Sequence, residues 1–161
     1  IALFTGMRRN EIASLRWDYI DLDGRALHIP KPKNGDPLDL PLADFILKLL
    51  KERRESTGES PWVFPSNGRT GHLVETKKFT GRVAARPGVE FTLHDLRRTF
   101  VSIAESLDVP HYALKRLLNH RLSGDVTAGY IVSQPERLRG PVEAVAASIL
   151  EQVANKNEDA A

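Results

Sequence analysis

The sequence predicts a mainly α-helical domain that contains a small three-stranded antiparallel β meander. Two observations predict this fold class. Apolar residues recur at helical spacing over most of the chain, whereas residues 19–41 show short apolar runs separated by turn dipeptides. These dipeptides, Asp23-Gly24 and Asn34-Gly35, favour tight hairpin turns because such turns require a positive φ.

The expected elements follow in chain order. Gly6 interrupts an opening helix that continues over Arg9–Leu15, and the meander comes next. The last hairpin of the meander should be an exposed edge, because its prolines cannot donate ladder hydrogen bonds. Further helices are expected from Ala43 to about Arg54 and at about Glu75–Ala85, Leu93–Ser106, His111–Leu118, Val126–Ile131 and Pro135–Val153.

The composition excludes several classes of protein. The chain has 161 residues, a net charge of +2 and no cysteine, so a disulfide scaffold and a thiolate metal site are ruled out. No apolar run approaches the roughly 20 residues that a membrane helix needs, and no secretory signal segment opens the chain. We therefore expect one globular domain in the cytoplasm. The uncapped apolar start at Ile1 suggests that a preceding part of the protein is missing.

The charge is unevenly distributed along the chain. From Glu143 onwards four acidic residues face a single base, Lys156, whereas the stretches Glu75–Arg98 and Pro110–Arg121 are locally basic. On charge alone, ordinary solvated helix faces are the favoured explanation of this pattern, with a nucleic-acid partner as the alternative.

A candidate phosphate site lies in the segment FTLHDLRRTF. Thr92 followed three residues later by Asp95 forms a capping box, so a helix begins here. His94 lies in the first turn and Arg97 one turn further on the same face. Free N–H groups, an imidazole and a guanidinium together suit a phosphate. A surface helix start with a chance histidine is the simpler alternative.

Other residues with reactive side chains lie at positions that make them candidates for a functional site. Arg8 directly follows the break at Gly6, where a purely solvated role is unexpected. Lys31 and Lys33 would share one face of the hairpin and reach a ligand above the sheet, although lysines also protect edge strands from aggregation. His120 ends an apolar helix, and Tyr130 follows ten residues later. Tyrosine is a nucleophile only where cations stabilise its phenolate.

Each of these motifs alone has an ordinary structural explanation. Taken together, however, the motifs resemble those of the tyrosine recombinase, or phage integrase, family, and they follow one another in the same order as in that family. The matching segments are Thr5-Gly6-Met7-Arg8 with Glu11, Lys33-Asn34-Gly35, His94-Asp95-Leu96-Arg97-Arg98-Thr99-Phe100, Leu118-Asn119-His120 and Tyr130. The resemblance covers about residues 1–150 and implies the catalytic fold of enzymes that break and rejoin DNA. Asn119 stands where Gly is commoner, and Ile131-Val132 replaces a frequent Thr-His.

The resemblance implies a DNA strand transferase that needs no metal or cofactor. Tyr130 would attack the scissile phosphate to form a 3′-phosphotyrosyl link. Arg8, Arg97 and His120 would stabilise the transition state. Lys33 would protonate the leaving 5′-oxygen, and His94 would accept the tyrosyl proton or hold the phosphate. The residues expected to support the site or contact DNA are Glu11, Lys31, Lys77, Lys78 and Arg98.

The implied function is site-specific integration or excision of a phage, prophage or genomic island, in the bacterial nucleoid or a phage-infected host. The expected partner is double-stranded DNA at attachment sites, bound by a homotetramer that the C-terminal helix assembles. Residues 1–141 would form a catalytic domain truncated at its N-terminus, without its DNA-binding domain. Residues 142–161 would form a helix and acidic tail that contact another protomer, although packing on their own domain is equally open.

Three alternatives remain beside the recombinase. A type IB topoisomerase would use the same chemistry for strand relaxation, and an inactive DNA-binding regulatory module would keep the fold without cleavage. A histidine-based metal hydrolase is disfavoured, because His94 and His120 lack carboxylate or histidine partners at ligand spacing.

Overall fold

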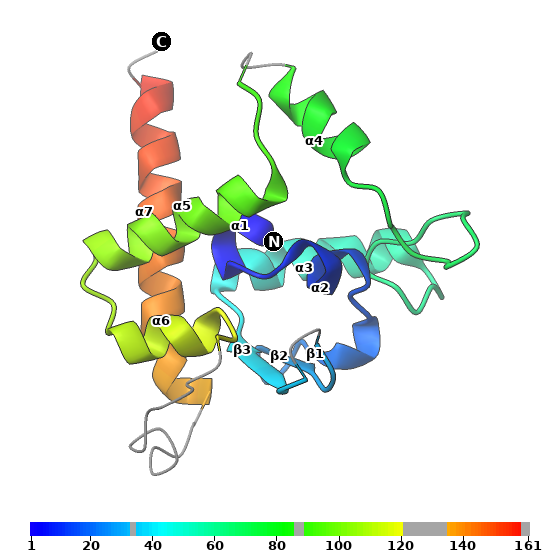
Figure 1. Cartoon of the computed structure of the whole chain (residues 1–161), viewed down its shortest axis with the longest axis horizontal. Coiled ribbons are helices and arrows are strands. Elements are labelled where there is room, and N and C mark those ends of the chain that lie inside the picture. The colour runs from blue at the N-terminus through cyan, green and yellow to red at the C-terminus, as the bar shows by residue number, and fades with distance from the viewer. Residues whose placement is uncertain (33–34, 86–88, 121–134, 159–161) are drawn as a thin grey trace.

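A computed structural model describes residues 1–32, 35–85, 89–120 and 135–158 of the chain. Helices surround a small sheet, which confirms the predicted mainly α-helical class (Figure 1). The described helices are α1 (Ala2–Thr5), α2 (Arg9–Ala13), α3 (Asp44–Thr57), α4 (Lys77–Ala84), α5 (Leu93–Ser106), α6 (His111–Leu117) and α7 (Arg139–Glu158), with 3-10 turns at Trp17–Tyr19 and Pro135–Leu138.

Most expected helices begin and end within two or three residues of their predicted bounds. The exception is the last helix, because its first residues, Pro135–Leu138, form a 3-10 turn and α7 starts only at Arg139. Pro141 then lies in the first turn of α7, where its lack of an N–H costs no helical hydrogen bond. The helix expected at Val126–Ile131 lies outside the described residues.

The sheet is the predicted antiparallel meander. Strands β1 (Ile20–Asp21), β2 (Ala26–Ile29) and β3 (Leu38–Pro41) pair in the order β1-β2-β3, so β3 lies at an edge of the sheet. This edge is not exposed as expected, because the turn Pro135–Leu138 and helix α6 pack against β3. Leu27 pairs with Leu40, and both are buried on the face that meets the helices. On the other face His28 lies opposite Asp39, with Nδ1 of the ring 2.6 Å from the carboxylate.

One detail of the first turn was predicted wrongly. Gly24 was expected to adopt the positive φ of the turn, but the structure places Arg25 there, at φ 55°. The Asp21 side chain accepts hydrogen bonds from the backbone N–H groups of Asp23 and Gly24 at 3.1 and 2.7 Å. A Cβ at Gly24 would come close to the exposed Asp21 carboxylate, so a larger residue there would displace that side chain from the turn. Gly35 in the second turn has the expected positive φ of 88°.

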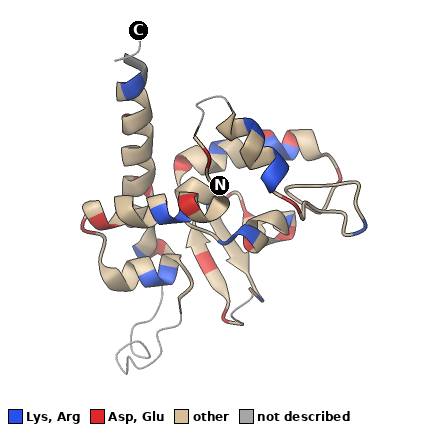
Figure 2. Ribbon diagram, turned by 45° about the horizontal axis from the view of Figure 1, so that its top comes forward, with Lys and Arg blue, Asp and Glu red and all other residues tan. Residues whose placement is uncertain are grey.

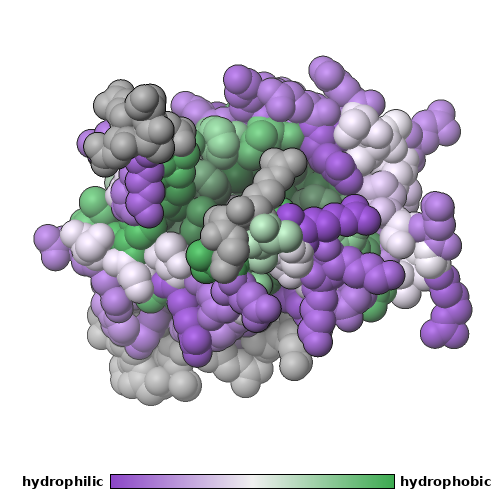
Figure 3. Space-filling view, turned by 90° about the horizontal axis from the view of Figure 1, so that it is seen from above, coloured by the Kyte–Doolittle hydropathy of each residue, from purple (hydrophilic) through white to green (hydrophobic). Residues whose placement is uncertain are grey.

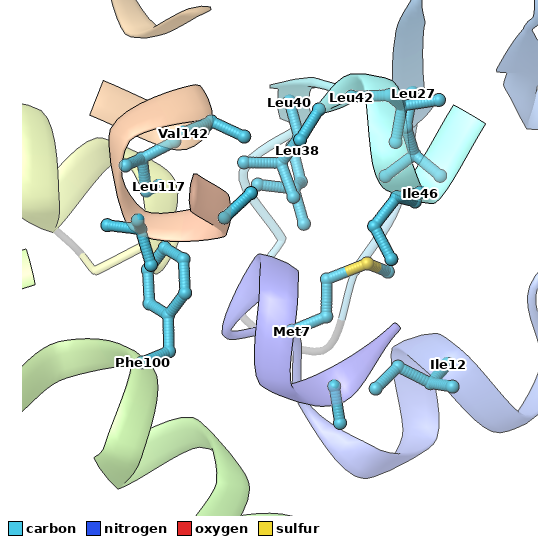
Figure 4. Packing of buried hydrophobic residues seen from close by; sticks show 14 of the residues in the cluster. Met7, Ile12, Leu27, Leu38, Leu40, Leu42, Ile46, Phe100, Leu117 and Val142 are labelled. Carbon is cyan, nitrogen blue, oxygen red and sulfur yellow. The ribbon is translucent and has the colours of Figure 1, made fainter. Parts of the chain in front are cut away.

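The core lies between the sheet and the helices (Figure 4). The Met7 side chain points towards Ile46 of α3, while Phe100 of α5 packs towards Leu117 of α6. Phe100 and Ile46 are fully buried, so this part of the chain has no room for larger side chains.

Helix α7 crosses α5 and packs against both α5 and α1 (Figure 1). Its apolar residues Val142, Val145, Ala146 and Ile149 are buried in the core of the same chain. Glu143 adds polar contacts, accepting from the Arg25 guanidinium at 2.7 Å and from the Asp44 N–H at 3.1 Å. The first half of α7 therefore belongs to the core of this domain.

The surface retains some apolar residues. Figure 3 shows hydrophobic side chains gathered in the middle of one face, with hydrophilic side chains around them. The larger exposed apolar residues are Leu49, Val74, Phe79, Val83, Val89, Leu107, Leu150 and Val153. Among the described residues, no helix combines the length and hydrophobicity that crossing a bilayer demands.

Candidate active site

The break between α1 and α2 positions Arg8. Gly6 ends α1 in the left-handed conformation, at φ 61° and ψ 13°, and Arg8 is the extended residue that precedes α2. The buried Glu11 carboxylate accepts the Arg8 backbone N–H at 2.7 Å and the Arg8 guanidinium at 3.1 Å. Glu11 therefore holds Arg8 by its main chain and its side chain together.

The capping box predicted at the start of α5 is present. The Asp95 N–H donates to Thr92 Oγ1 at 3.2 Å, and the Asp95 carboxylate accepts the Thr92 N–H at 2.9 Å. These local bonds set where α5 begins and therefore where Arg97 lies along it.

Arg97 is buried and is held by backbone carbonyl groups. Its Nη1 donates to the carbonyl of Gly6, and its Nη2 donates to the carbonyl of Leu118 at 2.9 Å. Burial lowers the pKa of Arg97 to about 10, with a further lowering by Arg8 that Glu11 opposes. The guanidinium thus stays charged at neutral pH.

His120 follows the end of α6 and lies against Arg97. Its Nε2 is 3.0 Å from Nη2 of Arg97. A guanidinium only donates, so Nε2 accepts and a neutral ring carries its proton on Nδ1. Partial burial lowers the pKa of His120, and the charges of Arg97, Arg8 and Lys115 lower the pKa further. The ring is therefore neutral at pH 7.

These groups open into one cleft of about 600 Å³. Arg8, Arg97 and His120 line it together with His94 from the start of α5 and Lys31 from the β2–β3 hairpin. Four segments that are distant in the sequence thus bring mainly cationic or donor groups to one place. Glu11 is the acidic residue among the described residues of the lining, so the cleft suits an anion such as a phosphodiester.

Several predicted residues lie elsewhere. Lys33 and Tyr130 fall outside the described residues. Lys77 and Lys78 are exposed at the start of α4 and do not line this cleft. The Arg98 side chain is 72% exposed and lies beside Asp95, with Nη1 3.5 Å from the carboxylate.

Two contributions to the site were not predicted. The carbonyl groups of Gly6 and Leu118 accept hydrogen bonds from Arg97. Because every residue has a backbone carbonyl, the residue types in a sequence do not indicate which carbonyls act as acceptors. Asn119 accepts from Nη2 of Arg8 through its carbonyl at 3.2 Å and donates from its side chain to the carbonyl of Asp36 at 3.1 Å. The sequence signal for Asn119 was its departure from the commoner Gly at that position.

The structure also bears on metal binding. Within the part of the chain that is described, no group of three or more histidine and acidic residues is arranged to hold a metal ion.

Solved structures share this fold. The integrase of mycobacterium phage Brujita has a TM-score of 0.70 at 22% identity, over 89% of this chain and 48% of that chain. The integrase of the Tn1549 transposon, solved in complex with circular intermediate DNA, has a TM-score of 0.60 at 15% identity over 95% of this chain and 58% of that chain. The fold is therefore that of tyrosine recombinase and integrase catalytic domains.

The sequence comparisons agree with the fold. The model of the phage integrase family matches residues 1–137, and the chain belongs to this family. The prophage integrase IntF of Escherichia coli is 32% identical over 130 residues, which are 76% of this chain and 27% of IntF. The tyrosine recombinase XerD of Rhizobium meliloti is 33% identical over 127 residues, which are 72% of this chain and 40% of XerD. The chain thus spans less than half the length of these relatives.

Proposed function

We propose that the chain cleaves and rejoins DNA through a covalent 3′-phosphotyrosyl intermediate, as the catalytic domain of a site-specific recombinase. The observation that carries the proposal is the convergence of Arg8, Arg97 and His120 on one open cleft, with a buried carboxylate that orients the first arginine. The relatives named integrase and tyrosine recombinase support the same activity.

The proposed chemistry is an in-line displacement at phosphorus. The hydroxyl oxygen of Tyr130 forms a bond to the scissile phosphorus while the bond from phosphorus to the 5′-oxygen breaks. The tyrosyl proton passes to a base, for which His94 in the lining of the cleft is the candidate, and Lys33 donates a proton to the leaving 5′-oxygen. The reverse steps, with a 5′-hydroxyl of the partner strand, rejoin the DNA.

The cationic groups have a distinct task. The transition state carries additional negative charge on the non-bridging oxygens, and the guanidinium groups of Arg8 and Arg97 place positive charge and their remaining N–H donors beside them. Arg97 is already fixed by carbonyl groups and Arg8 by Glu11, so little reorganisation is needed when the charge develops. Nδ1–H of the neutral His120 ring supplies a further donor.

The proposed partner is double-stranded DNA. The structure of the Tn1549 integrase with its circular intermediate DNA supports this proposal. Basic residues also lie beyond the cleft, on α4, α5 and α6 (Figure 2), and we propose that Lys77 and Lys78 of α4 contact the DNA backbone.

We further propose a homotetramer on DNA. The second half of α7 supports this proposal, because Leu150 and Val153 leave 38% and 55% of their surface exposed on a helix whose first half is buried. In the proposed assembly these residues contact a neighbouring protomer.

The decisive experiment uses a nicked DNA substrate that traps the covalent intermediate, because the released 5′-fragment diffuses away. The wild-type chain should form a protein–DNA adduct, and Tyr130→Phe should form none while it still binds DNA. Tyr112→Phe is the matched control, since Tyr112 lies on α6 and accepts hydrogen bonds from Arg116 away from the cleft. An adduct that persists in Tyr130→Phe would refute the assignment of the nucleophile, and a wild-type chain that binds DNA without any adduct would favour an inactive binding module.

A further inference from the structure

Asn119 stands at the junction between α6 and His120. It adopts a left-handed backbone conformation, at φ 48°, and is buried, with 9% of its surface exposed. The helix end is closed by the N–H groups of Asn119 and His120, which donate to the carbonyls of Arg116 and Lys115 at 3.0 and 2.9 Å. The main chain of this residue thus turns the polypeptide from α6 to His120.

The same residue contacts two other segments of the site. Its carbonyl accepts from Nη2 of Arg8 at 3.2 Å, and its side-chain Nδ2 donates to the carbonyl of Asp36 at 3.1 Å. Asp36 belongs to the β2–β3 hairpin, 83 positions away in the chain. One residue therefore joins the segment of Arg8, the segment of His120 and the hairpin.

The side chain of Asn119 makes a hydrogen bond that the left-handed backbone conformation does not require. Glycine adopts a left-handed conformation at no steric cost and would close the helix end equally well. Asparagine tolerates this conformation better than most residues, but it brings an amide that can donate a hydrogen bond. Because that amide is buried and donates to the hairpin, its role lies in the contact and not in the turn.

The hairpin carries residues that bear on the reaction. The described ladder between β2 and β3 ends at the pair Ile29 and Leu38. Beyond it the chain contains Pro30, Pro32 and Pro37, which have no N–H to donate across the hairpin. Lys31 of this region lines the cleft, and Lys33, the proposed general acid, follows Pro32 in the sequence.

We propose that Asn119 is a positioning residue that couples the β2–β3 hairpin to the phosphate-binding groups, so that the hairpin presents its lysine to the leaving oxygen. This inference rests on the proposed function. Asn119 itself touches no reacting atom in this proposal, because it acts through Asp36 on the hairpin and through its carbonyl on Arg8.

The first test measures the contact without any catalysis. Amide hydrogen exchange is followed in the whole chain for wild type, Asn119→Gly and Asn119→Asp. Glycine keeps the left-handed turn and aspartate keeps the size, but neither has the amide donor. The exchange of the backbone amides of residues 35, 36 and 38–40 should become about fivefold faster in both variants, in line with the loss of one hydrogen bond, while the exchange of α3 and α5 stays unchanged.

A matched control uses a second left-handed helix end. Asp108 follows α5 at φ 53° and is exposed, and its N–H donates to the carbonyl of Glu105 at 3.1 Å. Asp108→Gly should leave the exchange of the hairpin unchanged. Hairpin exchange that is unaltered in both Asn119 variants would overturn the proposal.

The second test separates positioning from general damage. A DNA substrate with sulfur in place of the bridging 5′-oxygen releases a thiolate, which needs no proton because thiols are far more acidic than alcohols. With oxygen DNA, Asn119→Gly should cleave about tenfold more slowly than wild type, which corresponds to about 1.4 kcal/mol. With sulfur DNA its rate should equal that of wild type, and Lys33→Ala should show the same pattern.

The outcomes of the second test are distinguishable. Equal slowing of Asn119→Gly on both substrates, or no slowing on either, would overturn the coupling to the leaving group. If the wild-type chain forms no adduct on either substrate, the proposed function fails, and hydrogen exchange alone decides whether Asn119 holds the hairpin.

Discussion

A single methyl group added at Gly6 should disturb the core of the domain. A Cβ at this residue would lie 2.7 Å from Cδ1 of Phe100 and 3.0 Å from Cδ2 of Leu118. Phe100 is fully buried, so its ring has no free space into which to move. The left-handed φ of 61° adds a second penalty that is independent of the contact.

The two penalties give the expected magnitude for Gly6→Ala. A left-handed conformation costs a residue with a Cβ about 1 kcal/mol. Overpacking of a closed core costs about 1–3 kcal/mol. We therefore expect the free energy of unfolding to fall by about 2–4 kcal/mol, a large part of the stability of a small domain. The Gly6 carbonyl also accepts from Arg97, so adduct formation should fall with stability.

The assay is equilibrium unfolding in urea, with the midpoint compared at unchanged slope. Gly81→Ala is the control, because Gly81 lies inside α4 and nothing lies within 4 Å of its added Cβ. That substitution should raise the stability by about 0.5–1 kcal/mol. In a Phe100→Leu background, Gly6→Ala should cost less than in wild type, since the contacting ring atoms are gone. An equal cost in both backgrounds would refute the reasoning from the contact.

Three further predictions concern charges. Glu11→Gln keeps the size of the buried side chain but removes the charge that faces its arginine partner, so stability in urea should fall by about 1–3 kcal/mol and adduct formation should drop. The pKa of His120 is lowered in the folded chain, so the unfolded chain binds more protons below pH 6.5, and stability should fall as the pH drops through that value. Replacing Lys77 and Lys78 by Ala should weaken DNA binding and reduce the slope of log K against log salt by about 0.9 for each phosphate that is no longer neutralised.

Each of these predictions has a matched control. Glu52→Gln, on the exposed surface of α3, should leave stability unchanged. His111→Gln, at the exposed start of α6, should keep the slope of stability below pH 6.5, whereas His120→Gln should reduce it. Lys156→Ala, near the end of α7, should leave the salt dependence as in wild type. A salt slope that stays constant in the double lysine variant would contradict the proposed contacts of α4.

Local patterns were predicted well because their causes are local. The capping box of Thr92 and Asp95 starts α5 at the expected residue, since the groups that form it lie three positions apart. The break at Gly6 and the antiparallel order of the meander were predicted for the same reason. The error at Gly24 arose because the Asp21 side chain reorganises that turn and moves the positive φ to Arg25.

The sequence by itself determined the helical class, the meander, the family resemblance and the residue types that gather around the cleft. The tertiary structure alone decided how these residues are held. Arg97 is fixed by carbonyl groups of Gly6 and Leu118, 91 and 21 positions away, and every residue has such a carbonyl, so the sequence contains no mark of the contact. The tertiary structure also decided that the apolar residues in the first half of α7 are buried in their own domain. An apolar stripe indicates that a helix packs against some surface, but it does not indicate which surface.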